Sequence, residues 1–139
     1  NNRVAVRLAR QWFGLPYWDA VQASTVDGDR FTYQSRRVHR GGGEARFEAS
    51  WEVGGGKGPA ARDSLEHWLC ERYALYVVRG GRVLRGDVHH LPWPLHDLAV
   101  DVTVNSMTSP LGFATPGPPA HVSYSPGVDT VVWSLVAGG

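Results

Sequence analysis

A strict alternation of side-chain character over residues 44–53 constrains the fold of this chain more than any other feature. The apolar positions are Ala45, Phe47, Ala49, Trp51 and Val53, and the positions between them are Glu44, Arg46, Glu48, Ser50 and Glu52. A period of two places one set on each face of an extended strand. The segment therefore predicts a half-buried strand with its apolar face toward a core.

Similar strand signals recur at short intervals and are separated by turn residues. Two hairpins are predicted, one around Asp27-Gly28-Asp29 and one around Gly80-Gly81. The strands expected besides 44–53 are 17–25, 31–40, 73–79, 82–89, 98–105, 120–125 and 128–136. With 17 Gly and 9 Pro, the chain has the turn content of a sheet or barrel, and a helical bundle is disfavoured.

Two short helices complete the expected architecture. Residues 3–13 carry an apolar arc of Val4, Leu8 and Trp12 opposite a stripe of Arg3, Arg7 and Arg10, and Gly14 and Pro16 end this helix. A second helix is expected over 64–72, with Asp63 as N-cap and Glu66 completing a capping box. The predicted fold class is mainly β (α+β), a curved antiparallel sheet or β-barrel with two short helices. We expect one domain over residues 1–139.

Composition excludes several classes of function. No apolar run approaches membrane-spanning length, and Cys70 as the lone cysteine has no internal disulfide partner, so we expect a cytoplasmic protein. A formal net charge of +1 argues against nucleic-acid binding through the arginine stripe. His89, His90 and His96 are close in sequence but lack the spacing of a zinc site, so no metal and no cofactor are expected.

Four aromatic-rich segments carry a family resemblance. They are Phe13-Gly14-Leu15-Pro16-Tyr17-Trp18, Tyr33-Gln34-Ser35-Arg36, the stretch from Ser64 to Tyr73, and His89-His90-Leu91-Pro92-Trp93-Pro94-Leu95. Together they resemble the YqjF-like family, an uncharacterised family thought to share the acetoacetate decarboxylase-like fold. The resemblance extends from about residue 3 to residue 136. It implies a cone-like β-barrel around a pocket for a small organic acid, and that the chain corresponds to the C-terminal part of a longer family member.

The resemblance also implies a missing nucleophile. Acetoacetate decarboxylases form a Schiff base through the lysine of a Gly-x-Pro-Lys segment, whose pKa is lowered by its surroundings. In this chain Gly14-Leu15-Pro16 is followed by Tyr17, and a phenol cannot form an imine. The single lysine, Lys57, lies in a Gly-rich segment at 54–59 that predicts a flexible loop. Schiff-base chemistry is therefore not expected.

Several residues remain as candidates for a binding or catalytic site. The expected ligand-binding residues are Tyr17, Tyr33, Arg36, Arg37, Glu66 and Trp93, and the catalytic candidates are Glu66 and His89. Strand alternation lets only one of Arg36 and Arg37 point inward, where it would clamp a carboxylate. Each candidate also has a structural interpretation: Tyr17 as a packed aromatic, Glu66 as part of the capping box, and His89 or His90 as an imidazole bonded to a backbone carbonyl.

Three hypotheses about function follow. The leading one is a β-barrel that binds a small organic acid-like ligand and lacks the Schiff-base lysine. The second is an interaction module, a half-barrel completed by another segment or by a second copy in a homo-oligomer. The third is an enzyme that uses Glu66 or a histidine in acid–base chemistry without a covalent intermediate.

Overall fold

The computed structural model describes residues 3–15 and 17–137 of the chain. Its two α-helices are α1 (Arg3–Trp12) and α2 (Leu65–Cys70), and a single 3-10 turn covers Ser109–Leu111. The strands are β1 (Ala20–Asp27), β2 (Arg30–Arg37), β3 (Arg46–Gly58), β4 (Ala74–Arg79), β5 (Arg82–His90), β6 (Leu95–Asn105), β7 (Thr130–Val132) and β8 (Val136–Ala137). The prediction of a mainly β chain with two short helices is confirmed.

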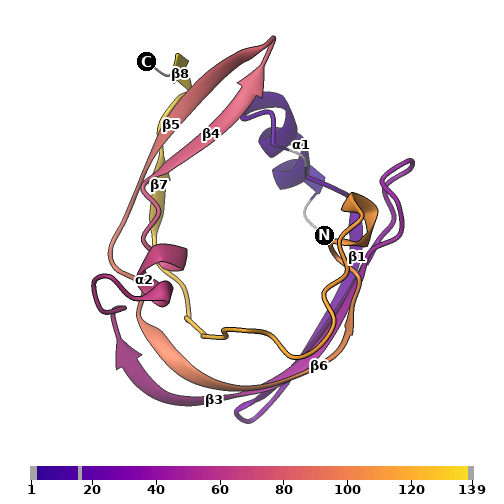
Figure 1. The fold of residues 1–139 in the computed structure, drawn as a ribbon, viewed down its shortest axis with the longest axis vertical. Helices are drawn as coiled ribbons and strands as arrows, with labels where there is room; N and C mark the ends of the chain where they lie inside the picture. Colours follow the sequence, from indigo (N-terminus) through magenta and orange to yellow (C-terminus); the bar gives the residue numbers. More distant parts are fainter. Residues whose placement is uncertain (1–2, 16, 138–139) are drawn as a thin grey trace.

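The strands form two antiparallel sheets. One has the order β1-β2-β3-β6, and in the other β4-β5-β7 are neighbours while β8 also pairs with β5. The two sheets lie along different parts of a ring, and α1 occupies a third part of it (Figure 1). Residues 91–94, which include Pro92 and Pro94, connect β5 to β6 and so join the two sheets.

Both predicted hairpins are present. Asp27 pairs with Arg30 across Gly28-Asp29, and Arg79 pairs with Arg82 across Gly80-Gly81. The two glycines of the second turn have φ values of 57° and 74°, which favour glycine because it lacks a Cβ. Two-residue turns of this kind match the twist of the strands that they join.

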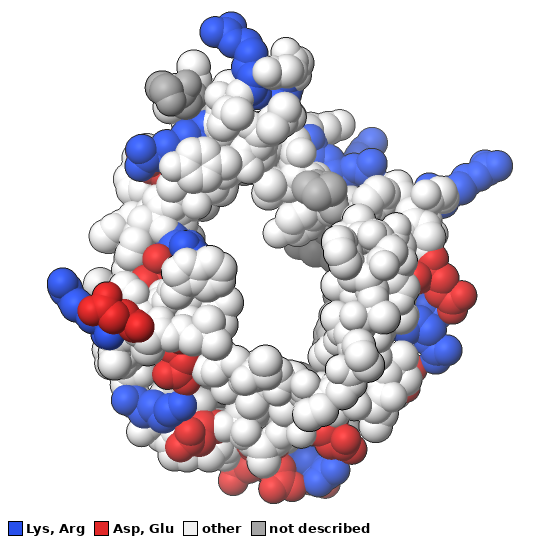
Figure 2. Space-filling model, in the orientation of Figure 1, with Lys and Arg blue, Asp and Glu red and all other residues white. Residues whose placement is uncertain are grey.

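The alternation at 44–53 is realised in β3. Phe47, Ala49 and Trp51 lie on the face toward the hollow of the ring, together with Leu98 and Val100 of β6. Charged residues lie mainly on the outer rim, and the hollow is bordered almost entirely by uncharged residues (Figure 2). The core is nevertheless small. Among the described residues, the buried apolar side chains are Ala45, Ala49, Val77 and Leu95.

The Gly-rich segment corrects one prediction. Residues 54–58 were expected to form a flexible loop, because glycine is depleted in strands, but they continue β3 as far as Gly58. Irregular register between β3 and β6 accompanies the glycines, between Val53 and Gly56 and again between Gly56 and Gly58. A Cβ on Gly54 would lie 3.1 Å from the Cβ of Asp97, so glycine permits the close approach of the two strands there.

The C-terminal strands are shorter than expected. The predicted strand 120–125 is reduced to one bridge, in which Tyr124 pairs with His96. The predicted strand 128–136 is divided into β7 and β8, which pair with different parts of β5. Prolines at 116, 118, 119 and 126 explain part of this difference, because proline has no amide to donate to a ladder.

The start of α2 corrects a second prediction. The N-cap is Ser64, whose hydroxyl accepts a hydrogen bond from the amide of His67 at 3.1 Å. Asp63 was expected in this role, but it has a φ of 66° and makes no capping bond to the helix. The capping box therefore does not form. The Glu66 carboxylate is therefore free to interact with residues outside the helix.

The described helices are short. None of them is long and apolar enough to cross a membrane.

Candidate functional site

A large groove lies on the inner face of β3 and β6. Its volume is about 1070 Å³, and the segment 114–124 forms its other wall. Phe47, Ala49 and Trp51 supply one side, because alternate residues of β3 face inward. Leu98, Val100 and Val102 of β6 extend the same apolar surface. The groove is large enough to enclose a small organic molecule.

Two ring nitrogens in the groove wall lack hydrogen-bond partners. The Nε1 atom of Trp51 and the Nε2 atom of His121 are both inaccessible to solvent and unbonded among the described residues. Leaving such an atom without a partner costs about 1–3 kcal/mol. The groove thus has an apolar body, and the two unbonded nitrogens lie just beneath the wall that the rings of Trp51 and His121 form.

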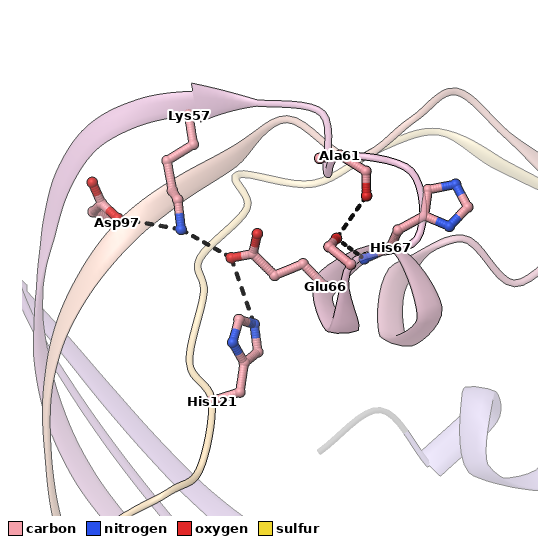
Figure 3. Close-up of polar contacts among 7 residues, drawn as sticks. Lys57, Ala61, Glu66, His67, Asp97 and His121 are labelled. Carbon is pink, nitrogen blue, oxygen red and sulfur yellow. Dashed lines mark hydrogen bonds and ion pairs between the residues drawn. The ribbon is translucent and has the colours of Figure 1, made fainter.

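A charged network lies at one end of this groove. The Lys57 Nζ atom donates to Glu66 Oε1 at 2.9 Å and lies 3.4 Å from Asp97 Oδ1. His121 Nε2 lies 3.7 Å from the same Glu66 oxygen, within ion-pair reach but beyond hydrogen-bond distance. Figure 3 shows the Glu66 carboxylate between Lys57 and His121, which come from β3 and from the loop after the 3-10 turn. Residues far apart in sequence therefore meet at Glu66.

The surroundings of Lys57 act against nucleophilic chemistry. The hydrogen bond to Glu66, followed by that to Asp97, raises the pKa of Lys57 above its ordinary value. A Schiff-base lysine requires the opposite shift, because only the neutral amine attacks a carbonyl. The sole lysine of the chain is thus held as an ammonium ion, and the structure strengthens the argument against imine chemistry with a local cause.

Some of the predicted ligand-binding residues form a second, smaller groove. Tyr17, Tyr33 and Arg37 line a space of about 360 Å³ together with Trp18. The Arg37 guanidinium lies over the Trp18 ring at 5.2 Å and also donates to the carbonyl of Gly42. Arg37 is therefore already occupied by protein partners. Pro16 of the decarboxylase-like segment lies outside the described residues.

The remaining predicted residues lie elsewhere. Arg36 is exposed on the opposite face of the sheet from Arg37, as strand alternation requires. Trp93 packs edge-on against His90 and borders a separate cavity with Leu69 and Leu95. Glu66 is held by Lys57 and His121 instead of lying near Tyr17. The structure thus distributes the six predicted residues over several places instead of one pocket.

The two adjacent histidines of β5 have different environments. His89 is exposed and opposite Val131 of β7. His90 is buried, with its Nδ1 atom 2.8 Å from the carbonyl oxygen of Leu91 and its Nε2 atom 3.4 Å from that of Arg72. Its ring stacks on Tyr73 with centroids 4.8 Å apart. His90 therefore has the structural role of an imidazole held between two backbone carbonyls, one of which accepts the single N–H of the neutral ring.

Metal-binding and thiol chemistry find no support in the described part of the chain. No group of three or more His, Cys, Asp or Glu residues there is arranged to hold a metal ion. Burial, with smaller contributions from Glu71 and Glu66, raises the pKa of the Cys70 thiol. A raised pKa lowers the fraction of reactive thiolate at neutral pH.

The fold and the groove together define a class: an antiparallel β protein with an apolar concave groove and a charged residue network at its end. Over residues 1–129 the chain matches the family DUF2071, described as an uncharacterized conserved protein, and it belongs to that family. It is 34% identical over 135 residues to the uncharacterized protein YqjF of Bacillus subtilis (strain 168). That match covers 97% of this chain and 55% of the relative. No solved structure matches the chain.

Sequence reasoning missed two residues of the groove as site candidates. Trp51 was placed on the inward face of its strand, and an indole N–H among apolar neighbours was a signal that could have marked it. His121 gave no such signal. It follows a proline-rich segment, and its approach to Glu66 depends on a contact between residues 55 positions apart in the sequence.

Proposed function

We propose that the chain binds a small organic acid-like ligand in the groove on β3 and β6, and that it does so without an imine intermediate. The observation that carries this proposal is the apolar groove of about 1070 Å³, whose wall includes the rings of Trp51 and His121. A ligand with an apolar body matches this wall, and a small rotation of the Trp51 ring would bring its N–H, which only donates, to an oxygen acceptor of the ligand. The acetoacetate decarboxylase-like barrel remains part of this proposal and rests on the resemblance.

The groove predicts which tryptophan responds to a ligand. When the chain is titrated with a panel of aliphatic and aromatic monocarboxylates, the indole N–H signal of Trp51 is expected to shift in heteronuclear NMR spectra. Trp51→Phe keeps an aromatic ring but removes the donor, and a lost hydrogen bond to a charged group costs about 1.5–3 kcal/mol. Affinity for the best carboxylate is therefore expected to fall by roughly tenfold or more.

Trp18→Phe is the matched control, because Trp18 lines the smaller groove with Tyr17 and Arg37. It is expected to leave carboxylate affinity unchanged. A panel member that shifts the Trp18 signal and not that of Trp51 would move the site to the smaller groove and contradict this proposal. Binding that survives Trp51→Phe at full strength would do the same.

The raised pKa of Lys57 predicts slow reaction of its amine. Reductive alkylation with acetone and cyanoborohydride at pH 7 is expected to modify Lys57 more slowly than a free lysine, because the rate follows the neutral fraction. The paired variant Glu66→Gln with Asp97→Asn removes the two carboxylates that raise the pKa. It is expected to react faster, as measured by mass spectrometry of the Lys57 peptide. If Lys57 of the unsubstituted chain reacted faster than a free lysine or than Lys57 of the paired variant, this prediction would be wrong.

A second candidate function is acid–base chemistry centred on His121. Its Nε2 atom is unbonded and faces the Glu66 carboxylate at 3.7 Å, while its ring borders the groove. An imidazole both donates and accepts protons, so this ring would serve as the proton carrier for a substrate bound in the groove. Glu66 would position the ring, since its carboxylate is already engaged by Lys57. Turnover of a carboxylic acid that is lost in His121→Gln, with binding retained, would support this candidate over simple binding.

A further inference from the structure

The chain exposes much more surface than a protein of its size normally does. Its accessible area is 10016 Å², whereas a folded monomer of 15.2 kDa typically exposes about 7,100 Å². The difference, about 2,900 Å², is larger than the roughly 800 Å² that one partner contributes to an interface of standard size. Surface on this scale is usually covered by polypeptide that packs as part of a fold.

Part of the excess surface belongs to α1. Two members of its predicted apolar arc remain open to solvent, Leu8 at 40% and Trp12 at 68% of their full exposure. The helix lies between the two sheets and is attached through polar contacts. Arg79 at the end of β4 donates to the carbonyl of Trp12 at 3.1 Å, and Arg10 lies 3.3 Å from the ring of His39 beyond β2. Exposed contacts of this kind contribute little stability.

The strand edges on either side of α1 are open as well. β1 is the outer strand of the first sheet, and β4 is the outer strand of the second. The amide of Val38 donates to the carbonyl of Asp19, so Asp19 faces β2 with its backbone polar groups. In an antiparallel pair every second residue does so, and the residues between them turn their amides and carbonyls outward. By this alternation the amides of Gln22 and Ser24 point away from β2.

The same argument applies to β4. Val88 donates to the carbonyl of Tyr73, so the amide of Tyr76 points away from β5. Both edges therefore present backbone donors and acceptors to the gap that α1 occupies, and long open edges of this kind are templates for added strands.

We propose that the edges of β1 and β4 each pair with a strand from an apolar polypeptide segment that lies beside α1 and covers its exposed face. The occupant is the kind of segment that YqjF carries outside the match, because 55% of that relative corresponds to this chain. The exposed apolar side chains of α1, Leu8 and Trp12, fit an apolar segment. This inference concerns a polypeptide partner and goes beyond the proposed ligand binding.

The test uses co-expression. The chain is produced together with the portion of YqjF that lies outside the match, and the products are separated by size-exclusion chromatography with light scattering. A complex with one copy of each is expected. Hydrogen exchange at the amides of Gln22, Ser24 and Tyr76 is expected to slow in the complex, since these amides gain partners. The chain alone is expected to exchange them rapidly.

Variants separate edge pairing from other contacts. Gln22→Pro with Tyr76→Pro removes two outward amides while leaving the bonds within each hairpin, because proline is tolerated on an open edge. This pair is expected to weaken the complex by about tenfold or more. Gln22→Ala with Tyr76→Phe keeps both amides and is expected to bind as the unsubstituted chain does. Circular dichroism of all variants checks that the hairpins persist.

Three results would overturn the proposal. A chain that stays monomeric and does not associate with the YqjF portion would show that the gap takes no such segment. If the chain associates with itself and this slows hydrogen exchange at the same amides, whether or not the YqjF portion is present, the partner at these edges is a second copy of the chain. Full affinity of the proline pair would exclude strand addition at these edges, even if a complex forms.

Discussion

Leu95→Ala is expected to lower the free energy of unfolding by about 2–5 kcal/mol, because a cavity adds to the lost burial. Leu95 is only 3% exposed, and it begins β6 opposite Gly58 at the end of β3. It also borders a small cavity with Leu69 and Cys70 of α2. Since α2 carries Glu66, the substitution should loosen the pairing of Glu66 with Lys57 as well as the core.

Leu91→Ala is the matched control for this experiment. Leu91 is the same residue type four positions earlier, but it is 70% exposed. Its replacement is expected to change stability by no more than about 0.5 kcal/mol. Urea denaturation followed by tryptophan fluorescence measures both variants. Equal effects of the two substitutions would mean that Leu95 is not buried in the folded chain.

His90→Ala is expected to destabilise the chain by about 2–4 kcal/mol, through a cavity and through lost hydrogen bonding to a backbone carbonyl. His90 is 6% exposed, and its ring nitrogens face the carbonyls of Leu91 and Arg72. The substitution also removes the stacking partner of Tyr73. Thermal and urea unfolding measure the change.

The neighbouring residue is a control within the same strand. His89→Ala removes an exposed imidazole and is expected to leave stability within about 0.5 kcal/mol of the unsubstituted chain. The comparison also tests the catalytic candidate His89. If carboxylate binding in the groove depends on His89 and not on Trp51, the site proposed on β3 and β6 is wrong.

Local patterns in the sequence were sufficient for most of the fold. The alternation in 44–53 depends only on the period of a strand, and it correctly places Ala49 and Trp51 on the inward face of β3. The turns at Gly28 and Gly80 depend on the conformational freedom of a few residues. Each of these features is decided within about ten residues, which is the range over which pattern reasoning works.

Features decided by distant contacts could not be predicted in this way. Residues 54–58 continue β3 because they meet β6, although their composition indicates a loop. Asp63 and Ser64 are both good N-caps by type, and the backbone conformation selects Ser64. The meeting of Glu66, Lys57 and His121 depends on three segments that no local signal connects.

The predicted site residues show the same limit. Tyr17, Tyr33 and Arg37 do share a groove, since Tyr33 and Arg37 lie on β2 and Tyr17 lies just before β1, which pairs with β2. Trp93 and Glu66 were grouped with them because the family resemblance implies a single pocket. In the structure, those two residues lie with α2 and the beginning of β6, at the other end of the first sheet.

The insertion of α2 and the β4–β5 hairpin between β3 and β6 has a consequence for the order of folding. Hairpins with two-residue turns form in about 1–10 μs, since the strands that pair are adjacent in the chain. Phe47 of β3 pairs with Asn105 of β6, and this pairing forms more slowly than a hairpin because it closes the long loop between the two residues. During synthesis, β1–β2 and β4–β5 can therefore be complete while β3 still lacks its neighbour on one side. The edge of β3 stays unpaired until β6 has been synthesised, and the apolar face containing Trp51 stays open to chaperones until the segment 114–124 has followed.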